Sequence, residues 1–360
     1  MDSTIRDFFN NDSISSIETT NAEIKGILES LKLSIHNIDN PGLGSLNRLF
    51  IASELIHLNK NNWSGLRLGL IEEIEAHLHP QVQLKVIKSL LKQKDAQLIL
   101  TTHSPNLASK VPLKNQIICR NNSAYSLSEE YTNLDSENYV FLEKFLDVTK
   151  SNLFFAKGLI LVEGWSEELI IPVIADKLGY NLIDKEVSII NVGNLGFSNY
   201  YKIFSRKDKK DMGINISIIT DCDVPKYKEE FENSEKIYRK VDETKYKAQC
   251  KDIVKQKTNS YGDVVKAFIA EEWTLEWCLM KSKVIGDTFK KVVEEIHNKS
   301  NWDNFEEELA RKLLMKTLNK SEIAYKLAQK ILEDNTLQFS ELNNDETMSH
   351  IVGAIEYACK

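Results

Sequence analysis

The sequence has few cysteines and no long apolar segment. Its 360 residues include five cysteines, none of them in a Cys-x-x-Cys pair, which argues against a zinc ribbon and fits a reducing compartment. No apolar run approaches the roughly 18–20 residues that a membrane-spanning helix requires. The N-terminus has no basic segment followed by an apolar one, so it does not resemble a signal peptide. These absences predict a cytoplasmic protein that does not contact a membrane.

The sequence also lacks the loop Gly-x-x-x-x-Gly-Lys-Ser/Thr. That loop supplies the backbone cradle and the lysine that hold the β- and γ-phosphates of a nucleotide. The net charge of −7 is unfavourable for nucleic acid, which an acidic protein binds only through a local basic surface or bound metal ions. The remaining composition, 42% hydrophobic and 28% charged, is that of a globular protein with two or three domains.

Two short apolar strands are predicted in the first part of the chain, and polar residues follow each of them. The strand at 66–71 ends in Glu72 and Glu73, and the strand at 98–102 ends at His103. A helix is expected between them. Taken singly, these residues could be strand-end charges and a packed histidine.

A turn that contains Gly42, Gly44 and Ser45 precedes a predicted helix at 46–56. One interpretation of this turn is a helix cap and nothing more. The other is an anion site, because backbone N–H groups at a helix start and a serine hydroxyl suit a phosphate. Apolar residues at helical spacing predict a further helix around 24–33.

Together these motifs resemble the second half of an ATP-binding-cassette (ABC)-type ATPase. The resemblance implies that Glu72 holds a magnesium ion through water, that Glu73 orients or deprotonates the attacking water, and that His103 contacts the γ-phosphate. It also implies that the turn at 42–45 is a degenerate signature loop, which contacts the nucleotide of a partner subunit. Glu72 departs from the aspartate usual in that family, although a longer acid still reaches a hydrated ion.

In that family the missing phosphate loop precedes the signature loop, and the chain begins too close to residue 42 to contain it. We therefore expect the chain to be the C-terminal part of a longer protein or one half of a split system. ATPase activity of the chain alone is not expected. ATP would bind only together with a separate chain that carries the phosphate loop.

In the second part of the chain, apolar strands end in carboxylates. A strand at 159–162 stops at Glu163, and a later strand stops at Asp221, which is followed by Asp223. Strands and helices alternate here, which predicts a parallel sheet with right-handed crossovers. The carboxyl ends of such strands share one edge, so these acids should lie together. Glu167, in the first turn of the next helix, can point to the same place or simply interact with the helix N-terminus.

Clustered carboxylates require a cation. Two like charges about 4 Å apart repel by about 4 kcal/mol at an effective dielectric constant near 20. Carboxylate oxygens select hard ions, so we predict one or two Mg²⁺ or Mn²⁺ ions rather than zinc or copper. The predicted ligands in this segment are Glu163, Glu167, Asp221 and Asp223.

The order of these acids resembles the Toprim fold, whose pattern is a glutamate after the first strand and Asp-x-Asp after the third. Toprim domains occur in topoisomerases, primases and nucleases, so the fold does not decide the reaction. Thr274-Leu275-Glu276 follows a fourth predicted strand at 264–269. It resembles the additional acid of the overcoming-lysogenization-defect (OLD) nucleases, which serves a second metal ion. The alternative is a helix cap by Thr274, with Glu276 in the first turn.

Residues 318–324 match the lysine-containing motif of the same family, in which Lys320 would stabilise developing charge on the phosphate; a solvated lysine is the alternative. The resemblance to OLD-family nucleases, which include the nuclease of the Gabija anti-phage system, covers about residues 40–335. It implies a metal-dependent DNA endonuclease in antiviral defence, with an ATPase half that gates or dimerises the nuclease, and hence a homo-oligomer. A locally basic stretch at 206–211 is a candidate DNA contact, with solvated surface as the alternative.

We accordingly predict an α/β protein with a partial ABC-type ATPase domain at 1–131 and a linker at 132–152. A Toprim domain at 153–345 would have a central parallel sheet and a helical C-terminal region, followed by a tail at 346–360. A highly charged insert at 226–258 is expected to form a helical arm near the metal site.

One alternative function is an ATPase half-subunit of a split SMC- or ABC-like complex, in which the Toprim domain is a non-catalytic docking or regulatory module. A topoisomerase would need a tyrosine-bearing domain and a primase usually a zinc module, and the sequence shows neither.

Overall fold

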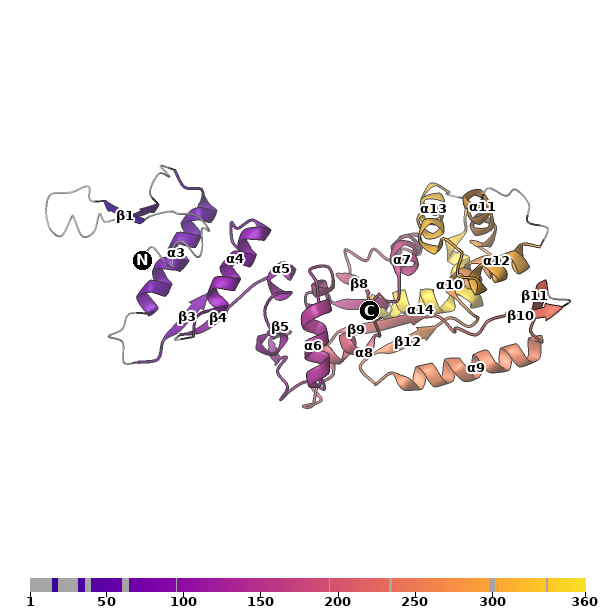
Figure 1. Cartoon of the computed structure of the whole chain (residues 1–360), viewed down its shortest axis with the longest axis horizontal. Coiled ribbons are helices and arrows are strands. Elements are labelled where there is room, and N and C mark those ends of the chain that lie inside the picture. Colours follow the sequence, from indigo (N-terminus) through magenta and orange to yellow (C-terminus); the bar gives the residue numbers. More distant parts are fainter. Residues whose placement is uncertain are drawn as a thin grey trace. The chain divides into compact units, whose positions relative to one another are not determined.

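The computed structural model of the chain is shown in Figure 1. It describes residues 15–18, 32–35, 40–59, 65–94, 96–193, 195–232, 235–297, 302, 304–334 and 336–360. The chain divides into two compact units, called here unit 1 (residues 1–116 and 145–151) and unit 2 (residues 117–144 and 152–360). In the part of the chain that the structure describes, no helix is both long and apolar enough to cross a membrane.

Unit 1 is an α/β structure built on a pair of parallel strands. Its elements are β1 (Ser15–Glu18), β2 (Lys32–Ile35), α3 (Leu43–Leu58), β3 (Leu68–Ile71), α4 (Pro80–Leu91), β4 (Gln97–Leu100) and α5 (Pro105–Ala108). β3 pairs with β4 in parallel, as the predicted strand–helix–strand order requires. The helix expected around 24–33 lies mostly outside the described residues, and residues 32–33 belong to β2.

One face of the β3–β4 pair packs against apolar side chains of α3 and α4, including Leu55 and Val86. The strands alternate between half-buried and exposed residues. Among the outward-facing residues, Leu70 is 70% and Ile99 51% exposed. This exposed apolar face of the β3–β4 pair lies on a short parallel sheet of a type that is usually covered on both sides.

Unit 2 contains the larger sheet and all but the last residue of α6. Its elements are β5 (Ile117–Arg120), β6 (Ser123–Ser126), α6 (Ser136–Phe145), β7 (Gly158–Val162), α7 (Trp165–Lys177), β8 (Val187–Asn191), α8 (Ser198–Tyr201), β9 (Asn215–Thr220), β10 (Tyr227–Glu232), β11 (Glu235–Lys240), α9 (Glu243–Ser260), β12 (Lys266–Ile269), α10 (Leu275–Lys281), α11 (Gly286–Ile296), α12 (Phe305–Leu314), α13 (Lys320–Glu333) and α14 (Ser349–Ala358). Short 3₁₀ helices lie at Leu113–Asn115 in unit 1, at Lys150–Phe154 across the boundary between the units, and at Lys202–Phe204, Phe339–Asn344 and Glu346–Met348 in unit 2.

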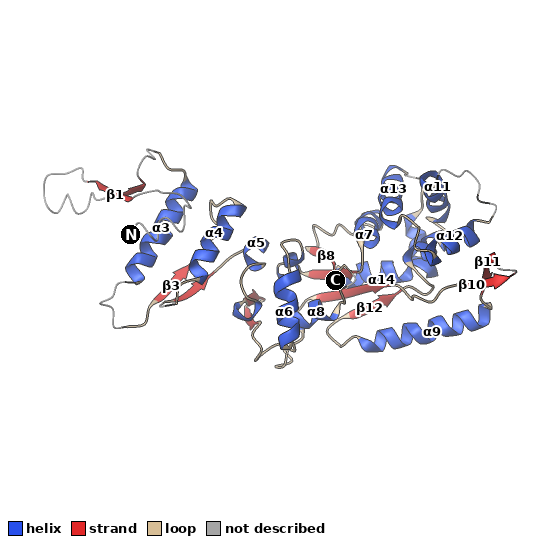
Figure 2. Cartoon of the chain, viewed as in Figure 1, coloured by secondary structure: helices blue, strands red, loops and turns tan. Residues whose placement is uncertain are grey.

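The central sheet of unit 2 has the strand order β12-β9-β7-β8, and all its pairings are parallel. Every residue of β7 is buried, which is the behaviour of a strand covered on both faces. Figure 2 shows the strands running through the middle of this unit, with α14 beside them and α11, α12 and α13 grouped at the upper right. The predicted parallel sheet and helical C-terminal region are therefore confirmed.

The C-terminal residues are part of the core rather than the tail expected at 346–360. The Ser217 hydroxyl on β9 donates to the carbonyl oxygen of Ala354 on α14 at 2.8 Å. The packing is so close at Gly158 that an added Cβ would lie 2.0 Å from the carbonyl oxygen of Ala358. A Cβ at Gly353 would likewise lie 2.8 Å from the Phe268 ring. Glycine at these positions lets α14 lie directly on the sheet.

The segment at 117–144 groups with unit 2, whereas residues 117–131 were expected in the first domain and residues 132–144 in the linker. The Tyr125 hydroxyl donates to the carbonyl oxygen of Asp211 at 3.0 Å, and Arg206 donates to that of Ser126 at 2.9 Å. Arg206 is buried and pairs with Asp208 at 2.8 Å. Within the basic stretch at 206–211, this arginine therefore has a structural role.

The charged insert differs from the expected helical arm. Its first half is an antiparallel hairpin of β10 and β11, and only its second half, α9, is helical. Most hairpin residues are charged, and the few apolar or aromatic ones, such as Phe231 and Ile237, do not alternate regularly with them. The sequence therefore shows no clear strand pattern in this segment.

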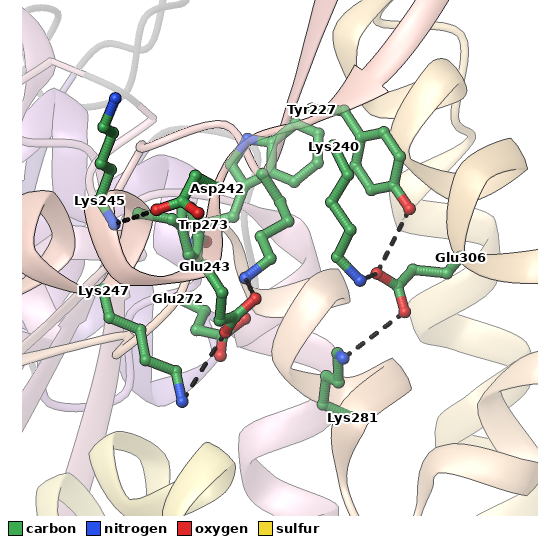
Figure 3. Close-up of polar contacts among 12 residues, drawn as sticks. Tyr227, Lys240, Asp242, Glu243, Lys245, Lys247, Glu272, Trp273, Lys281 and Glu306 are labelled. Carbon is green, nitrogen blue, oxygen red and sulfur yellow. Dashed lines mark hydrogen bonds and ion pairs between the residues drawn. The ribbon is translucent and has the colours of Figure 1, made fainter.

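Ion pairs fasten the insert to its surroundings (Figure 3). Glu306, on α12, accepts hydrogen bonds from Lys240 at 2.6 Å and Tyr227 at 3.4 Å, and its other oxygen lies 3.6 Å from the Lys281 ammonium. Lys226 is buried, pairs with Glu243 at 2.5 Å, and lies 3.9 Å from the ring centroid of Tyr246. Both ends of the hairpin and the start of α9 are thereby fixed in place.

Candidate functional site

The two predicted acid positions lie on neighbouring strands. β7 pairs with β9 in parallel, so Glu163 and Asp221, the residues that follow these strands, leave the same edge of the sheet. The Thr220 hydroxyl donates a hydrogen bond to Oε1 of Glu163. This arrangement follows from the parallel topology that the sequence predicted.

Glu167 folds back toward the same edge. It lies in the first turn of α7, whose N-terminal cap is Gly164. A Cβ added to Gly164 would lie 3.5 Å from Oε2 of Glu167, so the carboxylate lies over the start of its own helix. There it benefits from the positive end of the helix dipole and approaches Glu163.

The fourth strand of the sheet brings in another acid. Thr274 caps α10, as one interpretation of the sequence predicted. The second residue of α10, Glu276, is also close to Glu167 and Asp221, and its side chain is only 3% exposed. Its Oε2 lies 2.8 Å from the Lys320 ammonium at the start of α13. The backbone N–H of Leu275 donates to Oδ1 of Asp221 at 2.7 Å, which ties this cap to β9.

We use the term carboxylate cluster for Glu163, Glu167, Asp221 and Glu276. Burial raises the pKa of Glu167 to about 7, and the charges of Glu276 and Glu163 act in the same direction. Burial likewise raises the pKa of Asp221, with further contributions from the neighbouring carboxylates. These like charges crowd one another, and the nearby cation, Lys320, offsets only part of the repulsion.

The pKa of Lys320 reflects the same crowding. Burial alone would lower the pKa of this ammonium, but the charge of Glu276 and those of Asp221 and Glu167 outweigh burial and raise it. Lys320 is therefore held in its charged form beside the carboxylate cluster, where a nuclease would need a fixed positive charge.

Asp223 lies apart from the carboxylate cluster. Its side chain is 63% exposed and pairs with the Lys257 ammonium at 2.6 Å. Its backbone has φ of +64°, and its N–H donates to the carbonyl oxygen of Trp273 at 2.8 Å. A left-handed backbone at a residue other than glycine is strained, and such strain gathers at functional sites. Cys222, between the two aspartates, is buried against α9 beside Cys250.

Sequence reasoning missed Lys257 and Tyr261. Lys257, near the end of α9, also donates to the carbonyl oxygen of Asp221 at 2.7 Å. Both residues line a pocket beside Glu163. Nothing in the local sequence distinguishes Lys257 from the other lysines of the insert, because its role depends on where α9 ends in space.

The donor chemistry of the carboxylate cluster fits a hard divalent cation. All its members supply oxygen. Burial, together with the charges of neighbouring carboxylates, raises the pKa values of Glu167 and Asp221, and a cation would relieve that repulsion. In the described residues no three or more His, Cys, Asp or Glu side chains are already close enough to hold an ion. The residues of the carboxylate cluster therefore fit a divalent cation, and their side chains would move closer together when the ion binds.

In unit 1 the predicted nucleotide residues lie at the carboxyl ends of β3 and β4. The N–H of Glu73 donates to the Thr101 hydroxyl at 3.0 Å, and the N–H of His103 donates to Oε1 of Glu75 at 2.5 Å. Glu73 has φ of +44°. Glu72, Glu73 and His103 are exposed. Glu75, which sequence reasoning did not single out, holds the two loops together.

The turn at 42–45 is held against the loop that follows β3. A Cβ at Gly44 would lie 2.4 Å from the carbonyl oxygen of His77, so glycine is required there for packing. Gly42 caps α3 without a side-chain bond and has open space around it. The Ser45 hydroxyl accepts a hydrogen bond from Arg48 at 3.1 Å. The predicted phosphate contacts of Gly42, Gly44 and Ser45 remain predictions.

The first and the second part of the chain each match a model of a known domain. Residues 154–223 match the model of the overcoming lysogenization defect protein-like TOPRIM domain, and residues 1–108 match the AAA ATPase domain. The second part of the chain therefore carries an OLD-like Toprim domain. The region interpreted as an ABC-type ATPase half is thus a partial AAA ATPase region, and the region after it is an OLD-like Toprim domain. Toprim domains typically bind divalent metal ions.

Two curated relatives carry the name endonuclease GajA. The protein from Bacillus cereus strain HuB5-5 is 30% identical over 230 residues, 54% of this chain and 32% of the relative. The protein from strain VD045 is 28% identical and covers 43% of this chain and 26% of the relative. The chain thus spans about a third or less of the length of these relatives.

Solved OLD structures also match. The C-terminal region of the Xanthomonas campestris pv. campestris OLD protein is 18% identical with a TM-score of 0.35, and covers 58% of this chain and 94% of that one. The corresponding region from Burkholderia pseudomallei is 20% identical with a TM-score of 0.35, and covers 57% of this chain and 98% of that one.

Proposed function

We propose that this chain is a metal-dependent DNA endonuclease that acts in antiviral defence. The observation that carries the proposal is the convergence of Glu163, Glu167, Asp221 and Glu276 from separate elements, beside one charged lysine. Distant similarity to the GajA endonucleases supports the same reaction and a DNA substrate. Mg²⁺ and Mn²⁺ fit the all-oxygen donor set best.

Glu163 and Asp221, on adjacent strands, are the proposed ligands of a first ion, with Asp223 joining them once it is released from Lys257. Glu167 and Glu276 are the proposed ligands of a second ion. When bound, such ions activate water and stabilise the leaving oxygen in an in-line displacement at phosphorus. Lys320, held charged by Glu276, is placed to compensate the negative charge that develops on the phosphate.

Cleavage of supercoiled plasmid in Mg²⁺ or Mn²⁺ tests the proposal. We expect nicked or linear product with the ions and none with a chelator. Glu163→Gln should lower the cleavage rate about 100-fold or more, because it removes a charged ligand without changing shape. Glu186→Gln is the matched control, since this glutamate pairs with Lys157 in an exposed ion pair outside the carboxylate cluster. Intact plasmid at every metal concentration, or equal cutting by Glu163→Gln, would refute the proposal.

A second candidate function rests on the exposed apolar face of β3–β4 in unit 1, where Leu70 and Ile99 are outward-facing. The chain could be an ATPase half-subunit that this face joins to a separate chain with the phosphate loop, with the Toprim domain as a docking module. ATP hydrolysis on mixing with such a chain, lost in Glu73→Gln and unaccompanied by DNA cleavage, would favour this alternative. DNA cleavage that depends on Glu163 would exclude it.

A further inference from the structure

A pocket of about 430 Å³ opens at the carboxyl edge of the unit 2 sheet and falls within the roughly 300–1,000 Å³ typical of ligand sites. It adjoins the carboxylate cluster, because Glu163 belongs to both. Its lining includes Phe197, Tyr201 and Tyr261 as aromatic residues and Glu163, Thr220 and Lys257 as polar ones. None of these aromatic residues has a role in the proposed hydrolysis.

The aromatic rings come from two distant segments of the chain. Phe197 and Tyr201 belong to the connection after β8, and Tyr261 directly follows α9. The Tyr261 ring meets Phe197 edge-on at a centroid distance of 6.1 Å and Tyr201 at 6.3 Å. Phe197 and Tyr201 are buried, whereas Tyr261 is only half-buried. Tyr261 is therefore the ring available to a flat aromatic ligand, which gains from stacking on it.

The polar residues divide the pocket by charge. Glu163, whose carboxylate accepts from Thr220, disfavours an anion on its side. Lys257 supplies a positive charge on another side of the pocket. Its ammonium is held 2.7 Å from the carbonyl oxygen of Asp221 and 2.6 Å from the Asp223 carboxylate. A ligand with a flat uncharged part and an attached phosphate matches this distribution, and a nucleotide has that form.

We propose that this pocket binds one unstacked base of the DNA strand, with the neighbouring phosphate on Lys257. The inference rests on the proposed nuclease function and narrows its substrate. A base inside a duplex is stacked on both faces and cannot enter unless it is extruded. The preferred substrate is therefore DNA that is single-stranded or unpaired beside the scissile phosphate, and Tyr261 is the residue that selects it by stacking.

Fluorescence polarisation with the full chain tests the inference. The probes are a labelled single-stranded oligonucleotide, the same strand with abasic residues, and the matching duplex, in Ca²⁺ in place of Mg²⁺. Tyr261→Ala should weaken binding of the normal strand about five- to 100-fold, which is the usual value of one stacked base. Tyr261→Phe retains the ring and should bind within about twofold of wild type. The exposed Tyr325, on α13, provides the control Tyr325→Ala, which should not change the affinity.

The abasic strand keeps the phosphates but lacks the bases. Comparing its affinity with that of the normal strand therefore tests base binding even if Tyr261→Ala does not fold. Wild-type protein should bind the normal strand more tightly than the abasic strand or the duplex. Equal affinity for the normal and abasic strands, unchanged binding by a folded Tyr261→Ala, or no binding of the oligonucleotide by wild type would overturn the inference.

Plasmid cleavage measured in parallel separates the two proposals. Cleavage that depends on Glu163, together with binding that does not depend on the bases, would support the nuclease proposal and refute the base pocket. Binding that depends on the bases, without any cleavage, would support the base pocket and refute the nuclease proposal.

Discussion

Binding of a divalent ion to the carboxylate cluster should release protons, and the structure indicates how many. Glu167 has a pKa of about 7, raised by burial and by Glu276 and Glu163. At pH 6 such a carboxyl is about 90% protonated, and at pH 8 about 10%. A metal ligand must be ionised, so Glu167 should release about 0.9 proton at pH 6 and about 0.1 at pH 8. Asp221, whose pKa is also raised, adds to the release.

Isothermal titration calorimetry with Mn²⁺, run in buffers of different ionisation enthalpy, measures this number directly. Glu167→Gln should remove its share of the protons at pH 6 and change little at pH 8. Glu168→Gln is the matched control, because the adjacent Glu168 accepts from Asn191 at 2.8 Å and lies outside the carboxylate cluster. Proton release that is the same at both pH values, or unaltered in Glu167→Gln, would refute the electrostatic reasoning even if metal binds.

The same pKa predicts the stability of the metal-free protein. The pKa of Glu167 is raised in the folded state, so the folded state holds its proton between about pH 4.5 and pH 7 while the unfolded state loses it. The contribution of Glu167 to stability is therefore greatest at low pH and falls by up to about 3 kcal/mol as pH rises through this window. Urea unfolding of Glu167→Gln should lack this decrease.

Two further predictions concern the core of unit 2. Burial lowers the pKa of His350 to about 4, so the folded state resists protonation of this residue. The contribution of His350 to stability should fall by up to about 3 kcal/mol as pH drops from 6.5 to 4, and urea unfolding of His350→Gln should lack this contribution. Gly158→Ala would place a Cβ 2.0 Å from the Ala358 carbonyl oxygen and should cost about 1–3 kcal/mol in urea unfolding. The control Gly262→Ala, with nothing within 4 Å, should stay within about 0.5 kcal/mol of wild type.

The fold of unit 2 was largely predictable because the signals are local. Short apolar strands that stop at Glu163 and Asp221 indicate a parallel sheet, and the pairing of β7 with β9 follows from that topology. The ion pair of Glu276 with Lys320 brings together two residues that the family resemblance singled out separately. Their roles in catalysis stay predictions.

Other features depend on long-range packing that local pattern does not contain. Residues 349–358 have apolar side chains at helical spacing, but only the fit of α14 onto Gly158 shows that they belong to the core. The hairpin of β10 and β11 was taken for helix because its mostly charged residues show no regular strand alternation. Lys257 and Tyr261 could not be singled out, since their positions follow from the length and direction of α9.

The position of α9 also limits how the length of this chain can vary. The helix starts at a cap by Asp242, and its last turn places Lys257 beside Asp221 of the carboxylate cluster. Each residue of an α-helix advances about 1.5 Å and turns about 100°, so a single insertion within α9 would rotate the Lys257 ammonium away from Asp221. Residues added at the tip of the β10–β11 hairpin would not change the position of Lys257 relative to Asp221. Length differences among homologous chains should therefore accumulate in the hairpin, while α9 keeps a constant number of residues.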